Sequence, residues 1–167
     1  RVRVMDTPFP GITAESAYEV SGIAEAVKAT GGEMEVMSPV KFVKTAIPEG
    51  QDIQEWEVYQ DILDADVVIN VPIAKDHSLA RLSLGIKNLK GLIDIESRKR
   101  CHNSSREMNL HHYIADFLKV APPSFTLIDG IFSKEIGPAF ATGKPRRSDI
   151  LIGSADMLSA DMVGARI

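Results

Sequence analysis

The segment from Asn70 to Leu92 contains the side chains whose types and spacing are best suited to chemistry. A short, mostly apolar strand predicted over residues 66–71 is followed by Lys75, Asp76 and His77. In an open α/β sheet, ligands bind just beyond the carboxyl ends of the strands. A lysine there can act as a base or nucleophile when burial lowers its pKa, and a histidine can act as an acid, a base or a metal ligand. Lys75 and His77 are therefore candidate catalytic residues, although a lysine in a loop is more often simply solvated.

A second polar pair, Lys87 and Asn88, lies between Gly85 and Gly91 in a predicted helix. We interpret Lys87 as an anion-binding or acid–base group and Asn88 as a hydrogen-bonding group that orients a ligand. Each glycine inside a helix costs about 1 kcal/mol relative to alanine. Two of them indicate that another group packs closely against the helix backbone. That group is either a neighbouring strand, which is the more common case, or an anionic ligand.

Three histidines and one aspartate form a candidate metal-binding or proton-handling set. These residues are His77, His102, His111 and Asp129. His112 and Asp116 share a face of a predicted helix, which suits either a carboxylate that supports a metal ligand or an ordinary surface ion pair. The ion pair is favoured, because the sequence has no His-Glu-x-x-His motif and no paired Cys-x-x-Cys motif.

Several glycines and polar residues next to predicted strands and helices are candidate cofactor-binding residues. They are Gly85, Gly91, Asp129, Gly130, Ser154 and Asp156. Aspartate and serine often only cap helices and turns, and this interpretation is favoured for Asp6, Ser154 and Asp156. For Asp129 the two interpretations are balanced, because apolar residues follow it and an unpaired carboxylate at the start of a buried element is costly.

The predicted elements alternate between strand and helix. Strands are predicted over residues 1–5, 33–37, 41–45, 66–71, 125–128 and 150–153. Helices are predicted from the N-cap Thr13 to residue 30, over 55–63, 80–93 and 105–120, and after the N-cap Asp156. A polar loop is expected over residues 94–103, and Ser104 with Glu107 is typical of a capping box.

This alternation predicts an α/β fold with a mostly parallel sheet and helices on both faces, Rossmann-like in general layout. The chain lacks the Gly-x-Gly-x-x-Gly fingerprint of dinucleotide sites, the P-loop motif and the Gly-x-Ser-x-Gly motif of α/β-hydrolases. We expect a single domain over residues 1–167 that is cut at both ends, because the chain opens inside a strand and stops inside a helix.

Composition excludes several classes of protein. The net charge of −4 argues against a general nucleic-acid binder. No apolar run approaches the roughly 20 residues that span a bilayer, which argues against a membrane protein. No signal peptide is present, so a cytoplasmic location is expected. Cys101 is the only cysteine, which excludes an internal disulfide and a self-contained iron–sulfur cluster.

Residues 70–93 read NVPIAKDHSLARLSLGIKNLKGLI. This stretch resembles the signature of the family called domain of unknown function 362, in which Val-Pro-x-x-Lys-x-His is followed by Thr/Ser-x-Gly-x-Lys-Asn-x-x-Gly. His102 then precedes a helix that is similar to the family's Leu-His-x-x-Ile-Ala-Asp segment. Further similar segments are Asp129-Gly130-Ile131, Gly137-Pro138, Gly143 with Pro145, Ser154-Ala155-Asp156 and Ala160-Asp161.

The resemblance implies an α/β domain that is often encoded beside, or fused to, a ferredoxin-like module with a four-cysteine cluster. Family members begin earlier, with a strand and a Lys-x-Asn segment. They also more usually carry a lysine and a threonine where this sequence has Ile73 and Asp76.

Two hypotheses follow from the residues and the resemblance. The first is a cytoplasmic, redox- or metal-associated enzyme with a Lys/His/Asn site at the carboxyl edge of the sheet. The alternative is a non-catalytic module that binds an anion or a partner and serves an iron–sulfur protein. The candidate cofactors are a divalent metal and an iron–sulfur cluster carried outside this sequence. The candidate partners are a small anionic ligand and a ferredoxin-like module or protein, with no nucleic acid and no membrane.

Overall fold

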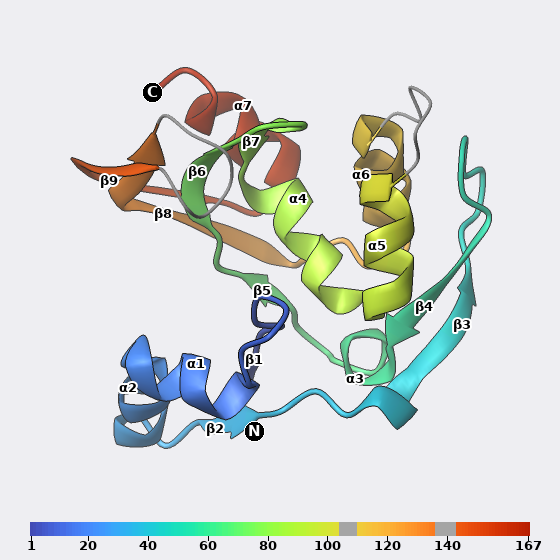
Figure 1. The fold of residues 1–167 in the computed structure, drawn as a ribbon, viewed down its shortest axis with the longest axis horizontal. Coiled ribbons are helices and arrows are strands. Elements are labelled where there is room, and N and C mark those ends of the chain that lie inside the picture. Colours follow the sequence, from blue (N-terminus) through green and yellow to red (C-terminus); the bar gives the residue numbers. More distant parts are fainter. Residues whose placement is uncertain (104–109, 136–142) are drawn as a thin grey trace. The chain divides into compact units, whose positions relative to one another are not determined.

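The structure is a computed structural model that describes residues 1–103, 110–135 and 143–167 (Figure 1). The chain divides into two compact units, residues 1–42 and residues 43–167. The single domain expected over the whole chain stays a prediction. Ser104, Glu107 and the Gly137-Pro138 segment lie outside the described residues.

The first unit is a small α/β arrangement. Strand β1 (Arg3–Met5) pairs in parallel with β2 (Glu33–Glu35), and helices α1 (Ala14–Val20) and α2 (Ile23–Ala29) connect them. The single helix predicted from Thr13 to residue 30 is wrong, because it is broken between α1 and α2. Gly22 at the break has a φ of 75°, in the left-handed region that glycine adopts without steric cost. A 3₁₀ turn, η1, follows at Pro39–Lys41.

The buried Tyr18 joins the three main parts of this unit. The single hydrogen of its hydroxyl is shared between the carbonyl oxygens of Asp6 (2.7 Å) and Glu35 (3.0 Å), and the hydroxyl oxygen accepts a hydrogen bond from the Asp6 N–H (2.9 Å). One α1 side chain therefore holds the carboxyl ends of both parallel strands.

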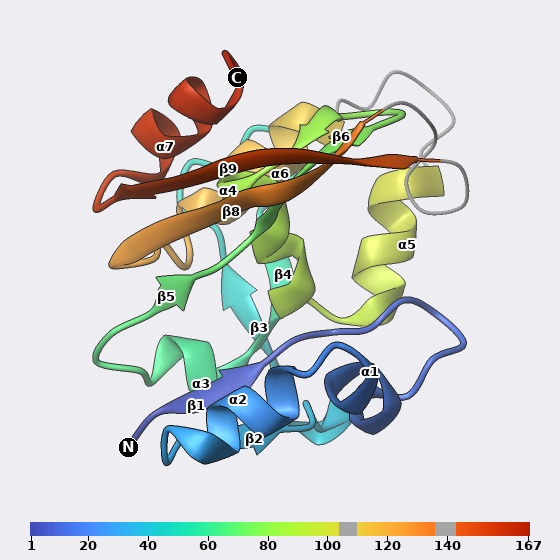
Figure 2. The same ribbon diagram turned by 90° about the vertical axis from the view of Figure 1, so that its left-hand side faces the viewer.

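The second unit contains a mixed sheet with β8 (Phe125–Glu135) at its centre. Two short strands, β5 (Ile69–Asn70) and β6 (Ile73–His77), run parallel to β8. Strand β9 (Lys144–Ser154) is antiparallel to β8, and Figure 2 shows these two long strands side by side. Strand β7 (Arg81–Ser83) is antiparallel to β6. The prediction of a mostly parallel, Rossmann-like sheet is therefore wrong: the fold is mixed α/β.

In its described residues, the second unit also contains a separate two-stranded sheet and six helical segments. The sheet pairs β3 (Phe42–Ala46) with β4 (Glu55–Tyr59). The helical segments are α3 (Gln60–Leu63), α4 (Gly85–Asn88), the 3₁₀ helix η2 (Leu89–Leu92), α5 (Ile95–Asn103), α6 (Leu110–Leu118) and α7 (Met157–Gly164). Figure 1 shows α5 next to α6.

Two predicted helices and one predicted loop are corrected by this arrangement. Residues 55–63 form β4 and then the short α3. Residues 80–93 form β7, α4 and η2 in succession. Residues 94–103, expected to be a loop, form α5, because the Asp94 carboxylate accepts hydrogen bonds from the Glu96 and Ser97 N–H groups (both 2.9 Å) and so caps the helix.

Two apolar clusters form the core of the second unit. The larger one contains Ile47, Ile53, Trp56, Val58, Leu89, Ile93, Cys101, Leu110, Ile114, Phe117 and Met157. The smaller one contains Leu84, Ile128 and Ala160, so it joins the start of α4 to β8 and α7. These two clusters fix the position of η2 and of α4, which carries the candidate Lys87.

Candidate functional site

The β6–β7 hairpin positions Lys75 and His77. The segment was expected to be a loop, but both residues lie in β6, where Lys75 is opposite Ser83 and His77 is opposite Arg81. Arg81 has a φ of 63°, which lets the chain turn back tightly after His77. Lys75 and His77 are two residues apart on one strand, so their side chains lie on the same face of the hairpin.

One nitrogen of the His77 imidazole forms hydrogen bonds within the turn. Its Nδ1 accepts hydrogen bonds from the backbone N–H groups of Leu79 and Ala80, both at 3.2 Å. Nδ1 must therefore carry no proton, so a neutral His77 carries its proton on Nε2.

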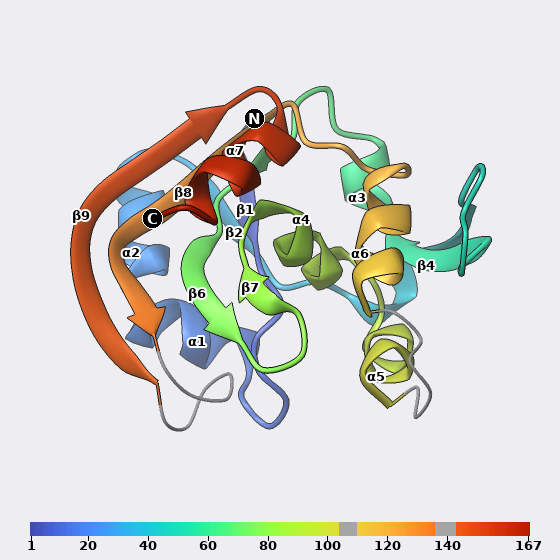
Figure 3. The same ribbon diagram turned by 90° about the horizontal axis from the view of Figure 1, so that it is seen from above.

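Lys87 is half-buried on α4, which Figure 3 shows beside the β6–β7 hairpin. Burial, together with the positive charges of Lys90 and Lys75, lowers the pKa of Lys87 to about 8. Among the described residues, no carboxylate forms an ion pair with Lys87 or with Lys75. The structure thus places two predicted site lysines near each other without a neutralising acid.

Lys90 is a further lysine that sequence reasoning missed. It lies in η2, and its exposed fraction is 7%. Burial lowers the pKa of Lys90 to about 8, and the electrostatic interaction with Cys101 acts in the opposite direction. Burial in turn raises the pKa of the Cys101 thiol to about 11. The signal was present in the sequence: Lys90 follows Lys87 by three residues, which is close to one helical turn.

Asn88 takes part in a chain of hydrogen bonds that reaches the backbone of α4. Its Nδ2 donates to Asn70 Oδ1 (2.8 Å), and Asn70 Nδ2 donates to the Gly85 carbonyl oxygen (2.9 Å) and approaches Met157 Sδ (3.3 Å). Asn70 is buried, with an exposed fraction of 6%, whereas Asn88 is exposed.

Asp161 on α7 holds the first turn of α4. Its carboxylate accepts hydrogen bonds from the N–H groups of Gly85 (2.7 Å) and Ile86 (3.0 Å). Burial raises the pKa of Asp161, and these two N–H groups act against that increase. A Cβ on Gly85 would lie 2.7 Å from Asp161 Oδ1, so glycine is required for this close approach. The group that packs against the Gly85 backbone is thus a carboxylate of the protein itself.

The remaining predicted cofactor-binding residues form local backbone contacts. Asp129 Oδ1 accepts a hydrogen bond from the Ile131 N–H (2.9 Å), and Ser154 Oγ accepts one from the Asp156 N–H (3.0 Å). Asp156 is the N-cap of α7, as the favoured interpretation expected. Gly130 is buried in β8, where a Cβ would lie 3.1 Å from the Ile150 carbonyl oxygen. Gly91 lies in η2.

The proposed metal-binding residues lie on different elements: His77 on β6, Asp129 on β8, His102 on α5 and His111 on α6. Over residues 1–103, 110–135 and 143–167, the structure shows no group of three or more His, Cys, Asp or Glu residues that could hold a metal ion. The side chain of His102 lies outside the described part of the chain.

His112 and Asp116 do not form the pair that their spacing suggested. His112 Nδ1 lies 3.1 Å from Asp52 Oδ2. The buried Asp116 instead accepts hydrogen bonds from the N–H groups of Gln51, Asp52 and Ile53. Asp116 therefore holds the loop between β3 and β4, and the side chain of His112 contacts Asp52 at the surface.

Comparison with known proteins identifies the family. The model of the domain of unknown function DUF362 matches residues 1–166. The thylakoid-associated protein sll1697 of Synechocystis sp. is 30% identical over 106 residues, which cover 62% of this chain and 33% of that relative. The aligned part thus spans only about a third of the relative's length. Among the described residues, no helix is both long and apolar enough to cross a membrane. With a match over nearly its whole length, the chain belongs to the DUF362 family.

Proposed function

We propose that residues 43–167 bind a small anionic ligand through Lys75 and Lys87. The observation that carries this proposal is the half-buried Lys87 ammonium, which has two further lysines near it and no carboxylate ion pair among the described residues. An anion placed between Lys75 and Lys87 would offset the burial and the like-charge repulsion that together lower the pKa of Lys87. Neighbouring like charges at a half-buried position are costly in the empty state, and a bound anion offsets that cost.

Because of the low pKa of Lys87, the proposed affinity for an anion depends on pH. At pH 7 most Lys87 side chains are still protonated, because the pKa is about 8. Bound anions favour the protonated form, so affinity is highest below pH 8 and declines as the pH rises through that value. An arginine at this position stays charged throughout the range.

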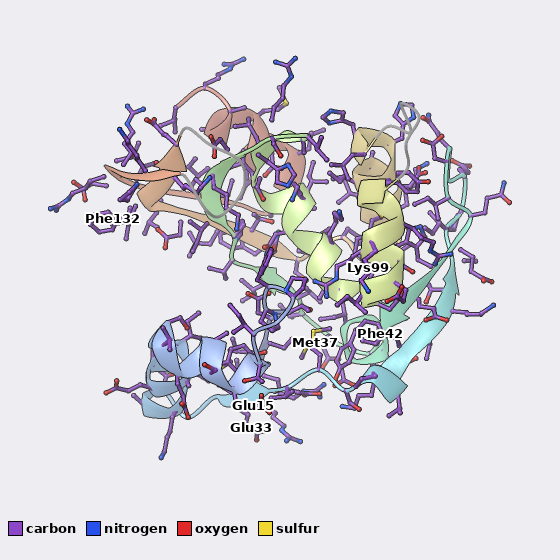
Figure 4. The ribbon with its side chains drawn as sticks, in the orientation of Figure 1. Glu15, Glu33, Met37, Phe42, Lys99 and Phe132 are labelled. Carbon is purple, nitrogen blue, oxygen red and sulfur yellow. The ribbon has the colours of Figure 1, made fainter. Side chains whose placement is uncertain are left out.

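The test is isothermal titration calorimetry with inorganic phosphate and with acetate at pH 7.0 and pH 9.5. We expect Lys87→Met to weaken binding at pH 7.0 at least about tenfold, which corresponds to about 1.4 kcal/mol. Lys87→Arg should lose less affinity between the two pH values than the wild type. The matched control is Lys99→Met on α5, labelled in Figure 4, because Lys99 is exposed and pairs with Glu96 (2.7 Å). Equal affinities for Lys87→Met and Lys99→Met would refute the proposal.

A redox- or metal-associated enzymatic activity stays a prediction. Its test is elemental analysis of the protein purified without oxygen, compared with the His77→Ala variant. Stoichiometric zinc, iron or nickel that disappears in the variant would support a metal role for His77. Metal content that is the same in both proteins would contradict it.

A further inference from the structure

We infer that the outer edge of β9 is a dimerisation surface, at which two copies of this chain pair residues 150–154 in antiparallel orientation. This inference goes beyond the proposed anion site, because it concerns a different strand and a different partner. The backbone groups of β9, its exposed side chains and its distribution of charge support it.

Strand β9 has an open edge. Among the described residues it pairs only with β8, and Figure 3 shows it on the outer side of β8. Asp129 in β8 donates its backbone N–H to the carbonyl oxygen of Pro72 (2.8 Å), which lies between β5 and β6 on the opposite side of β8. Since the pairs of an antiparallel ladder are alternately hydrogen-bonded and not, Asp129 and its β9 neighbour Leu151 form a non-hydrogen-bonded pair. The N–H and C=O groups of Leu151 therefore point to the outer edge, and those of Gly153, two residues further, do the same.

The two halves of this edge differ in their protection against another strand. Residues 144–149 contain Pro145, several charges and the left-handed Asp149 (φ 52°), all of which hinder the addition of a strand. Residues 150–154, Ile-Leu-Ile-Gly-Ser, contain no charge and no proline, and the Leu151 side chain is 57% exposed. Only the second half is therefore suited to pairing with another strand.

The open segment is self-complementary about Ile152. When two copies pair with their Ile152 residues opposite each other, Leu151 of each copy is opposite Gly153 of the other. Both residues point their backbone groups outward, so each of these pairs can exchange both of its N–H···O hydrogen bonds. A twofold axis relates the two pairs, so the assembly closes at a dimer.

The same register brings apolar side chains together. Directly opposite residues project from the same face of a sheet, and Gly153 has no side chain to obstruct Leu151 of the other copy. A Cβ on Gly153 would lie 3.0 Å from Phe125 Cζ, so the Phe125 ring covers this glycine. Leu151 of one copy would thus lie beside the Phe125 ring of the other. Both side chains are exposed in the single chain, so both would lose contact with water.

The charges along this part of the chain favour a second copy in antiparallel orientation. Residues 144–149 carry three cations and one acid, which are Lys144, Arg146, Arg147 and Asp149. Over residues 150–160 the only charged side chain is that of the exposed Asp156. Antiparallel pairing about Ile152 places the cationic half of each copy along Asp156 of the other. Parallel pairing would instead place the two cationic halves side by side, which is unfavourable.

Sedimentation velocity at pH 7 over a series of protein concentrations measures the pairing. We expect a monomer–dimer equilibrium with a dissociation constant on the order of 10–100 μM, as for a small interface. Leu151→Lys should raise this constant at least about tenfold, because it removes the contact with Phe125 and places two like charges near the axis. The matched control is Ile69→Lys, because Ile69 is similarly exposed (61%) but lies in β5 on the other side of β8. This control should dimerise as the wild type does.

Two further variants test the backbone and the charges separately. Leu151→Pro removes an outward N–H that the pairing with β8 does not use, so it should abolish the dimer while circular dichroism shows that the sheet is retained. Asp156→Asn keeps a capping side chain on α7 and removes its charge. It should weaken the dimer at low salt and have little effect at high salt.

Amide hydrogen exchange shows whether the copies meet at the assigned edge. Exchange of the Leu151 and Gly153 N–H groups should slow as the protein concentration rises through the dissociation constant. The N–H of Ile152 is bonded to β8 in the single chain, so its exchange should not depend on concentration.

Three results would overturn the inference. The first is a wild-type chain that stays monomeric at about 1 mM. The second is a dimer that survives in both Leu151→Lys and Leu151→Pro. The third is a dimer in which the exchange of the Leu151 and Gly153 N–H groups is unchanged, since the copies would then meet elsewhere.

Discussion

At the scale of single residues, His77 shows how hydrogen bonds decide which tautomer a side chain adopts. Its Nδ1 accepts two backbone N–H groups, from Leu79 and Ala80. We predict that neutral His77 carries its proton on Nε2, which ¹⁵N chemical shifts of the two ring nitrogens measure directly. A shift pattern with the proton on Nδ1 would contradict the structure of the turn.

Substitutions of His77 can separate its role in the turn from its role in the candidate site. The side-chain oxygen of asparagine lies near the position of Nδ1, so His77→Asn can still accept the turn hydrogen bonds, whereas His77→Ala cannot. We expect His77→Ala to lose about 1 kcal/mol more stability than His77→Asn in urea unfolding. Equal losses in the two variants would mean that the turn does not depend on Nδ1.

Asp116 is the buried carboxylate whose loss should matter most for stability. It is 2% exposed and accepts hydrogen bonds from three consecutive N–H groups, at Gln51, Asp52 and Ile53. Burial alone would raise the pKa of Asp116, but these donors and the Lys119 ammonium hold it below the usual value. We predict that Asp116→Asn lowers the free energy of unfolding by about 3 kcal/mol, because an amide NH₂ group then faces a backbone donor.

The depressed pKa also sets the pH range of this effect. A carboxyl group with a lower pKa in the folded state stabilises the protein above the unfolded-state pKa, which is about 3.9, and the stabilisation is lost as the pH falls through the folded-state value. The difference between wild type and Asp116→Asn should thus be constant from pH 7 to pH 5 and shrink below about pH 4. Asp52→Asn is the matched control, because it keeps the Asp52 N–H and removes only the exposed pairing with His112.

At the scale of elements, the contact between α4 and α7 depends on Gly85. A Cβ there would meet Asp161 Oδ1 at 2.7 Å, Met157 Cγ at 2.9 Å and Thr126 Cγ2 at 3.0 Å. We predict that Gly85→Ala destabilises the protein by about 1–3 kcal/mol, as overpacking does elsewhere. Thermal unfolding measures the change.

Gly164 in α7 provides the control for Gly85. A Cβ at Gly164 lies 3.2 Å from Leu84 Cδ1, the end of a flexible side chain that can move away. Alanine is also the better helix former by about 1 kcal/mol, so Gly164→Ala should cost less than Gly85→Ala. The reverse order would show that α4 and α7 do not pack as closely as the structure indicates.

Some elements could be predicted from the sequence because their signals are local. Asp156 caps α7 through the N–H groups of Leu158 and Ser159, within three residues of its own position. The prediction of a helix over residues 55–63 missed a signal that is also local. Trp56 and Val58 alternate with Glu55 and Glu57, a period of two that is typical of a strand, and burial of the two apolar side chains confirms that period.

Other elements could not be predicted because tertiary contacts decide them. The spacing of Leu82, Ile86, Leu89 and Ile93 fits one helix face, yet Leu82 is 40% exposed in β7. The helix begins only at Gly85, where Asp161, 76 residues away in the sequence, caps the first N–H groups. No local pattern in the sequence indicates such a distant partner, so the start of this helix could not be predicted from the sequence.

For the candidate site too, residue types and spacing could be used, but tertiary contacts could not be foreseen. Lys75, His77, Lys87 and Asn88 could be chosen by residue type and spacing, and the structure places Lys75 and Lys87 close enough for their charges to interact. The role of Asn70 was not predictable, because it follows from a hydrogen bond between residues 18 positions apart.

At the scale of the whole sheet in residues 43–167, one face carries exposed apolar side chains. These are Ile69, Ile73, Phe125 and Leu151, with exposed fractions of 61%, 51%, 39% and 57%, and we call them the apolar sheet face. The strand register places them together: Ile69 is opposite Phe125, and Ile73 and Leu151 flank Asp129 on either side of β8. The opposite face of β8 buries Thr126 and Ile128.

An exposed face that carries several large apolar side chains binds hydrophobic dyes in the folded state. We predict that the native protein at pH 7 enhances the fluorescence of anilinonaphthalene sulfonate, and that Ile73→Thr combined with Leu151→Thr lowers the enhancement to about half or less. Threonine is β-branched, a shape that strands favour, so the stability should change by less than about 1 kcal/mol. Val163→Thr, at an exposed position on α7, is the control and should leave the dye signal unchanged. A native protein that gives no dye signal while it remains folded would show that the apolar sheet face is covered in solution, because dye binding requires that these four side chains be accessible to solvent.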